Sequence, residues 1–235
     1  MPASSLTLGY VPGATPAKWA RIWAERHPDV PLQLRTVSAA HAADDVRAGA
    51  LDVALLRLPA DTTGLPVIPV YDETTVAVVP TNHILSAADE LTAADFEGEP
   101  KLLPLDDVVD WADAPGAPVD HRPETTEGAI ELVAAGTGVL IVPQSLARLY
   151  HRKDLTYRPI AGAPACPVVL AVQDGPQSVL IEDFIGIVRG RKPGSSRAQT
   201  EPTPKRTARE KTLAKQAARA AAGKVARKPG RSRGR

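Results

Sequence analysis

The clearest hydrophobic pattern in the chain covers residues 125–143, TTEGAIELVAAGTGVLIVP. Ile130 and Val133 lie on one face of a helix, and Gly136 can end that helix with a left-handed residue. A threonine pair at the start can cap it. Residues 139–142 are all apolar, which is typical of a strand covered on both faces. The segment therefore predicts a helix followed by a buried strand.

The same order of patterns occurs earlier, in residues 44–59, DDVRAGALDVALLRLP. A short helix is expected to end at Gly49, and Asp52 precedes a second continuous apolar strand. Two helix–strand units of this kind in one chain predict two α/β lobes.

The remaining patterns predict further strands and helices between these two units. Strands are expected at 5–11, 30–37, 65–71, 74–80, 101–105, 154–160 and 166–175. Helices are expected to begin near Thr15, Ser38 and Thr92 and to cover 144–151 and 178–190. We expect Thr15 and Ser38 to cap their helices, because a hydroxyl oxygen accepts from the free N–H groups of a first turn.

Composition adds a charge asymmetry to this picture. The chain has 235 residues, 43% of them hydrophobic, and a formal net charge of +1. That small value conceals a charge of −13 in residues 1–188 and +14 in residues 189–235. We expect an acidic folded body followed by a basic tail. The charge of the tail bears on which partners it can bind, and not on the fold.

The start of the chain and its cysteine content bear on location. The first residues, MPASSLTLGY, have neither the basic nor the apolar region of a secretory signal, and no apolar run approaches the length that spans a bilayer. Cys166 is the single cysteine, which excludes an internal disulfide framework. We expect a soluble cytoplasmic protein without membrane contact.

The tail, residues 191–235, is predicted to be disordered and rich in Lys, Arg and Ala, although residues 207–226 have helical propensity. It has almost no apolar stripe, so it cannot dock on a core. Its basic residues could neutralise nucleic-acid phosphates without reading sequence. These residues are Arg209, Lys211, Lys215, Arg219, Lys224, Arg227 and Lys228. A solubilising tail, or one that lies on the acidic body, is the alternative.

Signals for catalysis are weak. The sequence contains no nucleophile elbow, zinc-protease motif, phosphate loop or dinucleotide fingerprint. Four aspartates at 106, 107, 110 and 113 are spaced like a metal loop, but Val108, Val109 and Trp111 between them favour a solvated helix face. We therefore predict no catalytic residue, no bound metal and no cofactor.

Five segments resemble, in order, the effector-binding region of LysR-type transcriptional regulators. They are LTLGY, RHPDVPLQL, VRAGALDVALLRLP, VYDETTVAVVPTNHILS and ELVAAGTGVLIVP, and the resemblance covers about residues 5–190. It implies an α/β fold of two Rossmann-like lobes joined by two crossovers, as in type II periplasmic binding proteins. Family members also carry an N-terminal winged helix-turn-helix. The resemblance does not extend to that segment, so we expect either a stand-alone effector-binding protein or a gene model that has lost its start.

The resemblance also implies a division of the chain. We expect crossovers near residues 79–82 and 166–170. Lobe I would then comprise residues 1–80 and 166–190, and lobe II residues 81–165, with the tail at 191–235.

Ligands in open α/β sheets lie beyond the carboxyl ends of the strands, where helix N-termini converge. The residues that this rule predicts at a cleft between the lobes are Thr15, Ser38, Arg57, Leu105, Asp106, Thr125 and Thr126. Among these, Arg57 matches the place of an effector-binding arginine in some family members. Local N–H groups and one arginine predict a small anionic ligand, a carboxylate.

The resulting hypothesis is a homodimeric module that binds a small-molecule effector and acts in transcriptional regulation. Two alternatives from other classes remain. One is an enzyme on the same two-lobed scaffold, and the other is an architectural nucleic-acid-binding protein that acts through its tail.

Overall fold

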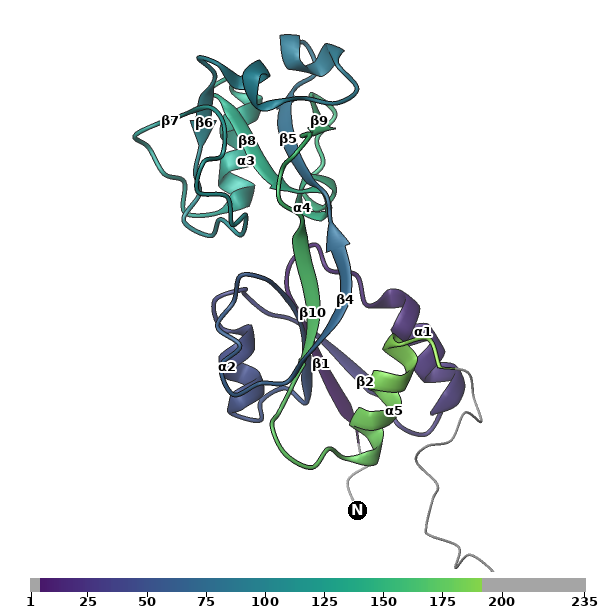
Figure 1. Ribbon diagram of the computed structural model, residues 1–235. Helices are drawn as coiled ribbons and strands as arrows, with labels where there is room; N and C mark the ends of the chain where they lie inside the picture. The colour runs from purple at the N-terminus through teal and green to yellow at the C-terminus, as the bar shows by residue number, and fades with distance from the viewer. Residues whose placement is uncertain (1–4, 192–235) are drawn as a thin grey trace, which may run out of the picture. The chain divides into compact units, whose positions relative to one another are not determined.

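The computed structural model describes residues 5–191, which form two five-stranded sheets (Figure 1). The first sheet has the order β2-β1-β3-β10-β4 and the second the order β7-β6-β8-β5-β9. The strands of the first sheet are β1 (Leu6–Tyr10), β2 (Leu32–Thr36), β3 (Val53–Arg57), β4 (Val67–Glu73) and β10 (Cys166–Val172). Those of the second are β5 (Thr75–Pro80), β6 (Pro100–Leu102), β7 (Ala117–Pro118), β8 (Val139–Pro143) and β9 (Leu155–Pro159). We call the first sheet with its helices lobe I and the second sheet with its helices lobe II.

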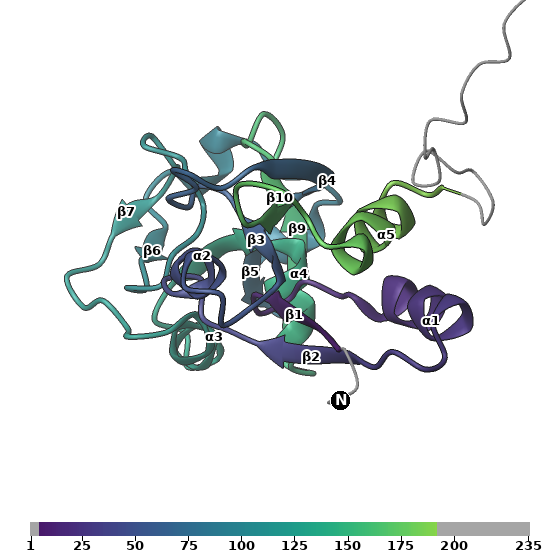
Figure 2. The same cartoon turned by 90° about the horizontal axis from the view of Figure 1, so that it is seen from below.

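Lobe I covers both faces of its sheet with helices. Its helices are α1 (Ala17–Arg26), α2 (Ala42–Arg47) and α5 (Val179–Val188). Figures 1 and 2 show α1 and α5 side by side at one face and α2 at the other. Trp23 and Phe184 meet edge to face between α1 and α5, with ring centroids 5.8 Å apart. Because both faces are covered, every residue of β3 is buried, which explains its continuous apolar sequence.

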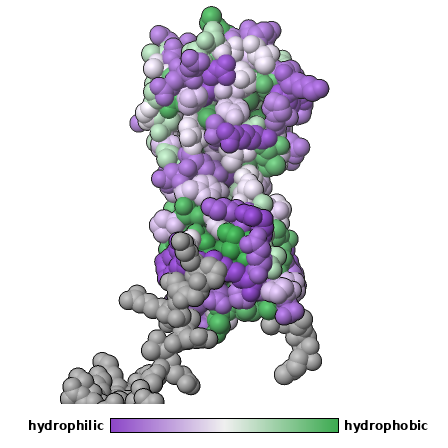
Figure 3. All heavy atoms as spheres, turned by 90° about the vertical axis from the view of Figure 1, so that its right-hand side faces the viewer, coloured by the Kyte–Doolittle hydropathy of each residue, from purple (hydrophilic) through white to green (hydrophobic). Residues whose placement is uncertain are grey.

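Lobe II has a separate core on each side of β8. Its helices are α3 (Thr126–Ala134), α4 (Gln144–Leu149) and the 3₁₀ helices η1 (Ile84–Ala87) and η2 (Ala93–Phe96). On one side Leu140 and Val142 pack in a cluster with residues of α3, and on the other Val139 and Ile141 pack in a cluster with Phe96. The prediction of a strand covered on both faces is therefore confirmed. Figure 3 shows that, on the face it displays, hydrophobic atoms gather over lobe I, whereas lobe II is mostly hydrophilic.

The crossovers between the lobes differ from those expected. Only Thr74 separates β4 from β5, so the chain leaves the first sheet after Glu73 rather than near residues 79–82. Strand β5 belongs to the second sheet, where it lies between β8 and β9. The return crossover precedes Cys166, which already pairs with Glu73 in the first sheet. The apolar residues of β5 suit a buried position in either sheet, so their pattern did not reveal which sheet they join.

The two expected caps of lobe I are wrong. The Thr15 hydroxyl donates to the Gly13 carbonyl at 3.4 Å, and α1 has no side-chain cap. The Ser38 hydroxyl lies 2.8 Å from Nδ1 of His41, which occupies the N-cap of α2. Pro16 occupies the N-cap of α1 in place of Thr15, and a turn at residues 39–41 separates Ser38 from α2. The threonine predicted to cap α3 is confirmed, because the Thr125 hydroxyl accepts from the Gly128 N–H at 3.1 Å.

Two other expectations concern a loop and the tail. Residues 103–116 contain no helix, so the predicted solvated helix face at 106–113 is wrong; Val109 and Trp111 instead pack against a lobe II core. The basic residues predicted to contact nucleic acid all lie outside the described part of the chain. No helix within residues 5–191 has the length and apolar character needed to cross a membrane.

Candidate functional site

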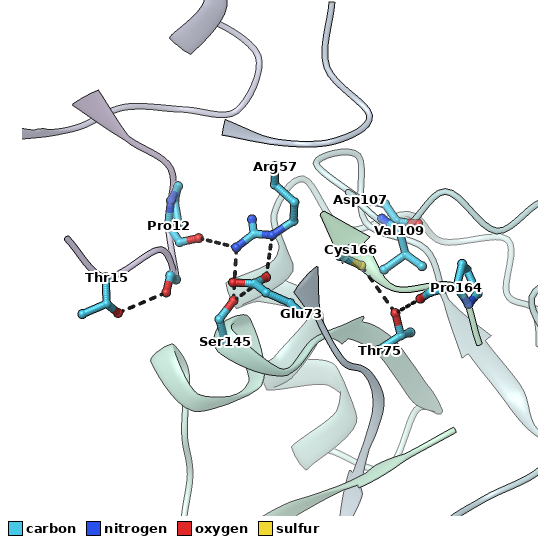
Figure 4. Close-up of polar contacts among 11 residues, drawn as sticks. Pro12, Thr15, Arg57, Glu73, Thr75, Asp107, Val109, Ser145, Pro164 and Cys166 are labelled. Carbon is cyan, nitrogen blue, oxygen red and sulfur yellow. Dashed lines mark hydrogen bonds and ion pairs between the residues drawn. The ribbon is translucent and has the colours of Figure 1, made fainter. Parts of the chain in front are cut away.

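A buried ion pair lies where the chain crosses between the lobes (Figure 4). Arg57 ends β3 and is 3% exposed, and Glu73 ends β4 and is 8% exposed. The Arg57 Nε donates to Glu73 Oε2 at 2.8 Å. A buried charge at the end of an apolar strand is tolerated only with such a partner, because an unpaired charge there would lose its hydration without compensation.

Two further residues complete this contact. The Arg57 Nη2 donates to the Pro12 carbonyl and to the Ser145 Oγ, both at 3.1 Å. The Ser145 hydroxyl in turn donates to Glu73 Oε2 at 2.9 Å. We call Pro12, Arg57, Glu73 and Ser145 the arginine network. It joins the β1–α1 turn and β3 of lobe I to α4 of lobe II.

Gly13 allows this close approach of the lobes. Its φ is +84°, and a Cβ at this position would lie 2.7 Å from the Ser145 Oγ and 3.3 Å from Nη2 of Arg57. Residues with a side chain rarely adopt this φ, and the space is already filled. The turn therefore requires glycine to present the Pro12 carbonyl to Arg57.

Two cavities adjoin the arginine network. The larger, of about 810 Å³, is lined by the β1–α1 turn, the end of β4 and helix α4, and includes Thr15, Glu73 and Ser145. The smaller, of about 440 Å³, is lined by residues of both lobes, including Arg57. Pro12 and Tyr150 line both cavities.

Five of the residues predicted at the cleft line the smaller cavity. They are Ser38, Arg57, Leu105, Asp106 and Thr126. Thr15 lines the larger cavity instead. Thr125 lines neither cavity, and its hydroxyl caps α3. The rule that ligands lie beyond the carboxyl ends of strands thus predicted residues of both lobes that line one cavity. Their role in binding stays a prediction.

Two arginines line the smaller cavity, and they differ in what they can offer a ligand. Arg47 uses all of its guanidinium nitrogens: Nε donates to the Thr63 carbonyl, Nη1 to Asp44 and Nη2 to the Asp61 carbonyl. Arg57 has no hydrogen bond at Nη1 within the described residues. Only 1% of the Arg57 side chain is exposed, and no fully buried side-chain nitrogen in that part of the chain lacks a partner, so Nη1 keeps no more than a small exposed surface. Among the guanidinium nitrogens of Arg57, Nη1 is the one with unused donors.

Lobe II contributes carboxylates to the same cavity. The Thr126 hydroxyl donates to Asp106 Oδ1 at 2.9 Å, and the Val109 N–H donates to Asp107 Oδ1 at 3.0 Å. Both aspartates keep exposed surface. Partial burial nevertheless raises the pKa of Asp107, and the neighbouring Asp106 carboxylate adds to the rise.

The arginine network includes two residues that sequence reasoning missed, Glu73 and Ser145. A signal for Glu73 existed, since an arginine at the end of the apolar strand VALLR requires an acidic partner in the folded state. Nothing in the sequence identified which of the many acidic residues that partner is. Ser145 is 88 residues from Arg57 along the chain, and only the packing of the two lobes brings them together.

The groups around the crossover are poorly suited to nucleophilic catalysis. Cys166 is 2% exposed, and its sulfur lies 3.4 Å from the Thr75 hydroxyl. Burial raises the pKa of the Cys166 thiol, which disfavours the reactive thiolate. Within residues 5–191, no three His, Cys, Asp or Glu side chains are grouped as metal ligands.

Comparison with solved structures shows which fold these lobes form. The effector-binding domain of BenM, solved with its effector benzoate, matches with a TM-score of 0.67 at 18% identity, over 80% of this chain and 91% of that one. The oxidised form of OxyR matches with a TM-score of 0.65 at 20% identity, over 80% of this chain and 93% of that one. The fold is therefore the two-lobed type II periplasmic-binding-protein fold of these domains.

Comparison of sequences gives the family. The Hca operon transcriptional activator HcaR of Escherichia coli is 29% identical over 79% of this chain and 67% of that protein. A probable hydrogen peroxide-inducible genes activator of Mycobacterium avium is 31% identical over 60% of this chain and 50% of that protein. The chain thus spans about half to two thirds of these relatives. The model of the LysR substrate binding domain matches residues 2–193, and the chain belongs to this family.

Proposed function

We propose that this chain is the effector-binding part of a transcriptional regulator and that it binds a small carboxylate in the smaller cavity. The observation that carries this proposal is the buried guanidinium of Arg57, whose Nη1 is available beside a cavity of about 440 Å³. This volume lies within the roughly 300–1,000 Å³ of small-molecule sites in proteins. The contact between lobes at this place gives a ligand there a direct influence on how the lobes are held together.

The energetics favour a local contact over the acidic body. Exposed charges more than about 10 Å apart are largely screened at physiological ionic strength. A hydrogen bond to a charged group contributes roughly 1.5–3 kcal/mol, which corresponds to about ten- to a hundredfold in affinity. A carboxylate that reaches Nη1 of Arg57 would therefore gain this contact against little opposition from distant charges. The negative charges close to it are those of the cavity lining, where Asp44 and Asp61 are paired with Arg47 but Asp106 and Asp107 are not.

Regulation is supported by the named relatives. HcaR and the mycobacterial protein carry activator names, and the BenM domain was solved with benzoate. We extend this to a cytoplasmic homodimer that changes transcription when the effector binds. The rival enzyme function gains no nucleophile from Cys166, which is a buried thiol with a raised pKa. Nucleic-acid binding by the tail stays a prediction.

The proposal can be tested with two matched arginine variants. Carboxylate metabolites are screened by thermal shift, and the best stabiliser is measured by calorimetry on the full chain. In Arg57→Lys the single ammonium will pair with Glu73 and leave no donor at the cavity, so we expect affinity to fall about ten- to a hundredfold. Arg47→Lys is the control, because Arg47 is already engaged by Asp44 and Asp61.

Two results would contradict the proposal. Stabilisers that are all neutral or cationic would remove the argument for a carboxylate. Equal affinity of the parent and Arg57→Lys would show that the ligand does not contact this guanidinium.

A further inference from the structure

The two lobes offer opposite charges to the smaller cavity. Lobe I offers Nη1 of Arg57, as described above. Lobe II offers Asp106 and Asp107, from the loop that follows β6. A ligand that lies between the lobes therefore meets a cation on one side and carboxylates on the other.

The carboxylates of the cavity fall into two kinds. Asp44 and Asp61 of lobe I form ion pairs with Arg47, at 2.6 and 3.3 Å. Asp106 and Asp107 form no ion pair within residues 5–191; each accepts a hydrogen bond from a neutral donor through Oδ1. Arg122 and Lys101 act on Asp107 only through longer-range charge interactions, so both carboxylates can still accept a direct contact from a bound cation.

This arrangement discriminates between classes of carboxylate. A ligand that carries only negative charge is attracted by Arg57 but repelled by Asp106 and Asp107 on the facing wall. The charge of Arg57 is also already compensated by Glu73, so the cavity has no excess of positive charge to offset that repulsion. A cationic group on the ligand converts the repulsion into a second attraction.

The rest of the lining indicates what joins the two charged ends. Besides the polar groups of Ser38, Thr126 and Tyr150, the cavity is lined by small or apolar side chains of both lobes, among them Ala43, Pro59 and Leu146. These groups offer no hydrogen-bonding side chain and favour an aliphatic segment.

We propose that the ligand is an amphoteric molecule of the amino-acid class, with its carboxylate at Arg57 Nη1 and its ammonium group at Asp106 and Asp107. This inference rests on the proposed function, because it specifies the ligand of the same cavity. Such a ligand bridges lobe I and lobe II, which gives its binding a mechanical consequence for the position of the lobes.

The test compares three forms of one carbon skeleton. The proteinogenic L-amino acids are screened on the full chain, and each hit is compared by calorimetry with its deaminated acid and its decarboxylated amine. We expect the amino acid to bind at least about tenfold more tightly than either partial analogue, since each analogue loses one charge-assisted contact.

The variants assign the effect to the lobe II wall. Asp106→Asn keeps an oxygen that can accept from Thr126, and Asp107→Asn keeps one for Val109, so both preserve the loop contacts. Each should weaken the amino acid about tenfold or more and leave the deaminated acid unchanged or tighter. Asp44→Asn is the matched control in the same cavity, because Asp44 is already paired with Arg47.

The outcomes separate this inference from the proposed function. If deaminated acids bind as tightly as amino acids, and Asp106→Asn weakens neither, the inference is overturned. If the Arg57→Lys variant then loses its affinity for the deaminated acid, the proposed function still stands. If no carboxylate, amino acid or amine binds the full chain, both are overturned.

Discussion

The two cavities beside the arginine network differ in a way that their volumes do not reveal. The larger has almost twice the volume of the smaller, yet its deeply buried polar groups satisfy one another: Glu73 accepts hydrogen bonds from both Arg57 and Ser145. The smaller cavity is lined by Arg57, whose Nη1 has no hydrogen bond within the described residues. The comparison teaches that a charged lining residue with a donor left unused indicates a binding site better than cavity volume does.

The largest expected effect concerns the network that lies between the cavities. Glu73→Gln keeps the shape of the side chain but leaves the guanidinium of Arg57 buried without its counter-ion. Removing one partner of a buried pair typically costs about 3–5 kcal/mol. Urea unfolding followed by circular dichroism measures the change in the free energy of unfolding.

The control for this variant is an ion pair with more solvent around it. Asp44→Asn removes a carboxylate that pairs with Arg47 at 2.6 Å and is 71% exposed. Such surface pairs contribute at most about 1 kcal/mol. Equal destabilisation by the two variants would contradict the view that the network holds the lobes together through a buried charge.

The smallest expected effects come from removing the hydroxyls of two threonines that the sequence predicted as helix caps. Thr125→Ala removes the hydroxyl that accepts from the Gly128 N–H and fixes the start of α3 at the smaller cavity. We expect a loss of about 1 kcal/mol in the free energy of unfolding. Thr15→Ala, at the larger cavity, removes an exposed hydroxyl that has one contact, at 3.4 Å. This variant should change the free energy of unfolding by less than about 0.5 kcal/mol. A reversed order, measured by the same unfolding experiment, would show that the cap of α3 is not formed in solution.

The folding pattern was predictable where apolar residues form continuous runs. The strands β3 and β8 are buried on both faces, and burial dictates their composition. The sheet to which β5 belongs was not predictable, because a buried strand in either lobe requires the same apolar residues. Long-range pairing, and not local propensity, places it beside β8 and β9.

The candidate site was predictable as a location but not as a set of contacts. The rule that ligands lie beyond the carboxyl ends of strands led to Arg57, Ser38 and Asp106, which do line one cavity. Arg57 pairs with Glu73 within lobe I, and both residues contact Ser145 of lobe II. The separation of 16 residues between Arg57 and Glu73 follows from the strand order of the first sheet, and that of 88 residues between Arg57 and Ser145 follows from the packing of α4. No local pattern encodes either contact.

The central claim is that the smaller cavity is the effector site, and one pair of variants tests it directly. Ala40 and Thr15 are exposed residues that line the smaller and the larger cavity, respectively. A tryptophan at either position fills its own cavity and leaves the other open. Calorimetry with the best stabilising ligand should show that Ala40→Trp abolishes binding and that Thr15→Trp changes the affinity by less than about threefold. Loss of binding in Thr15→Trp with full affinity in Ala40→Trp would place the ligand in the larger cavity and contradict the account.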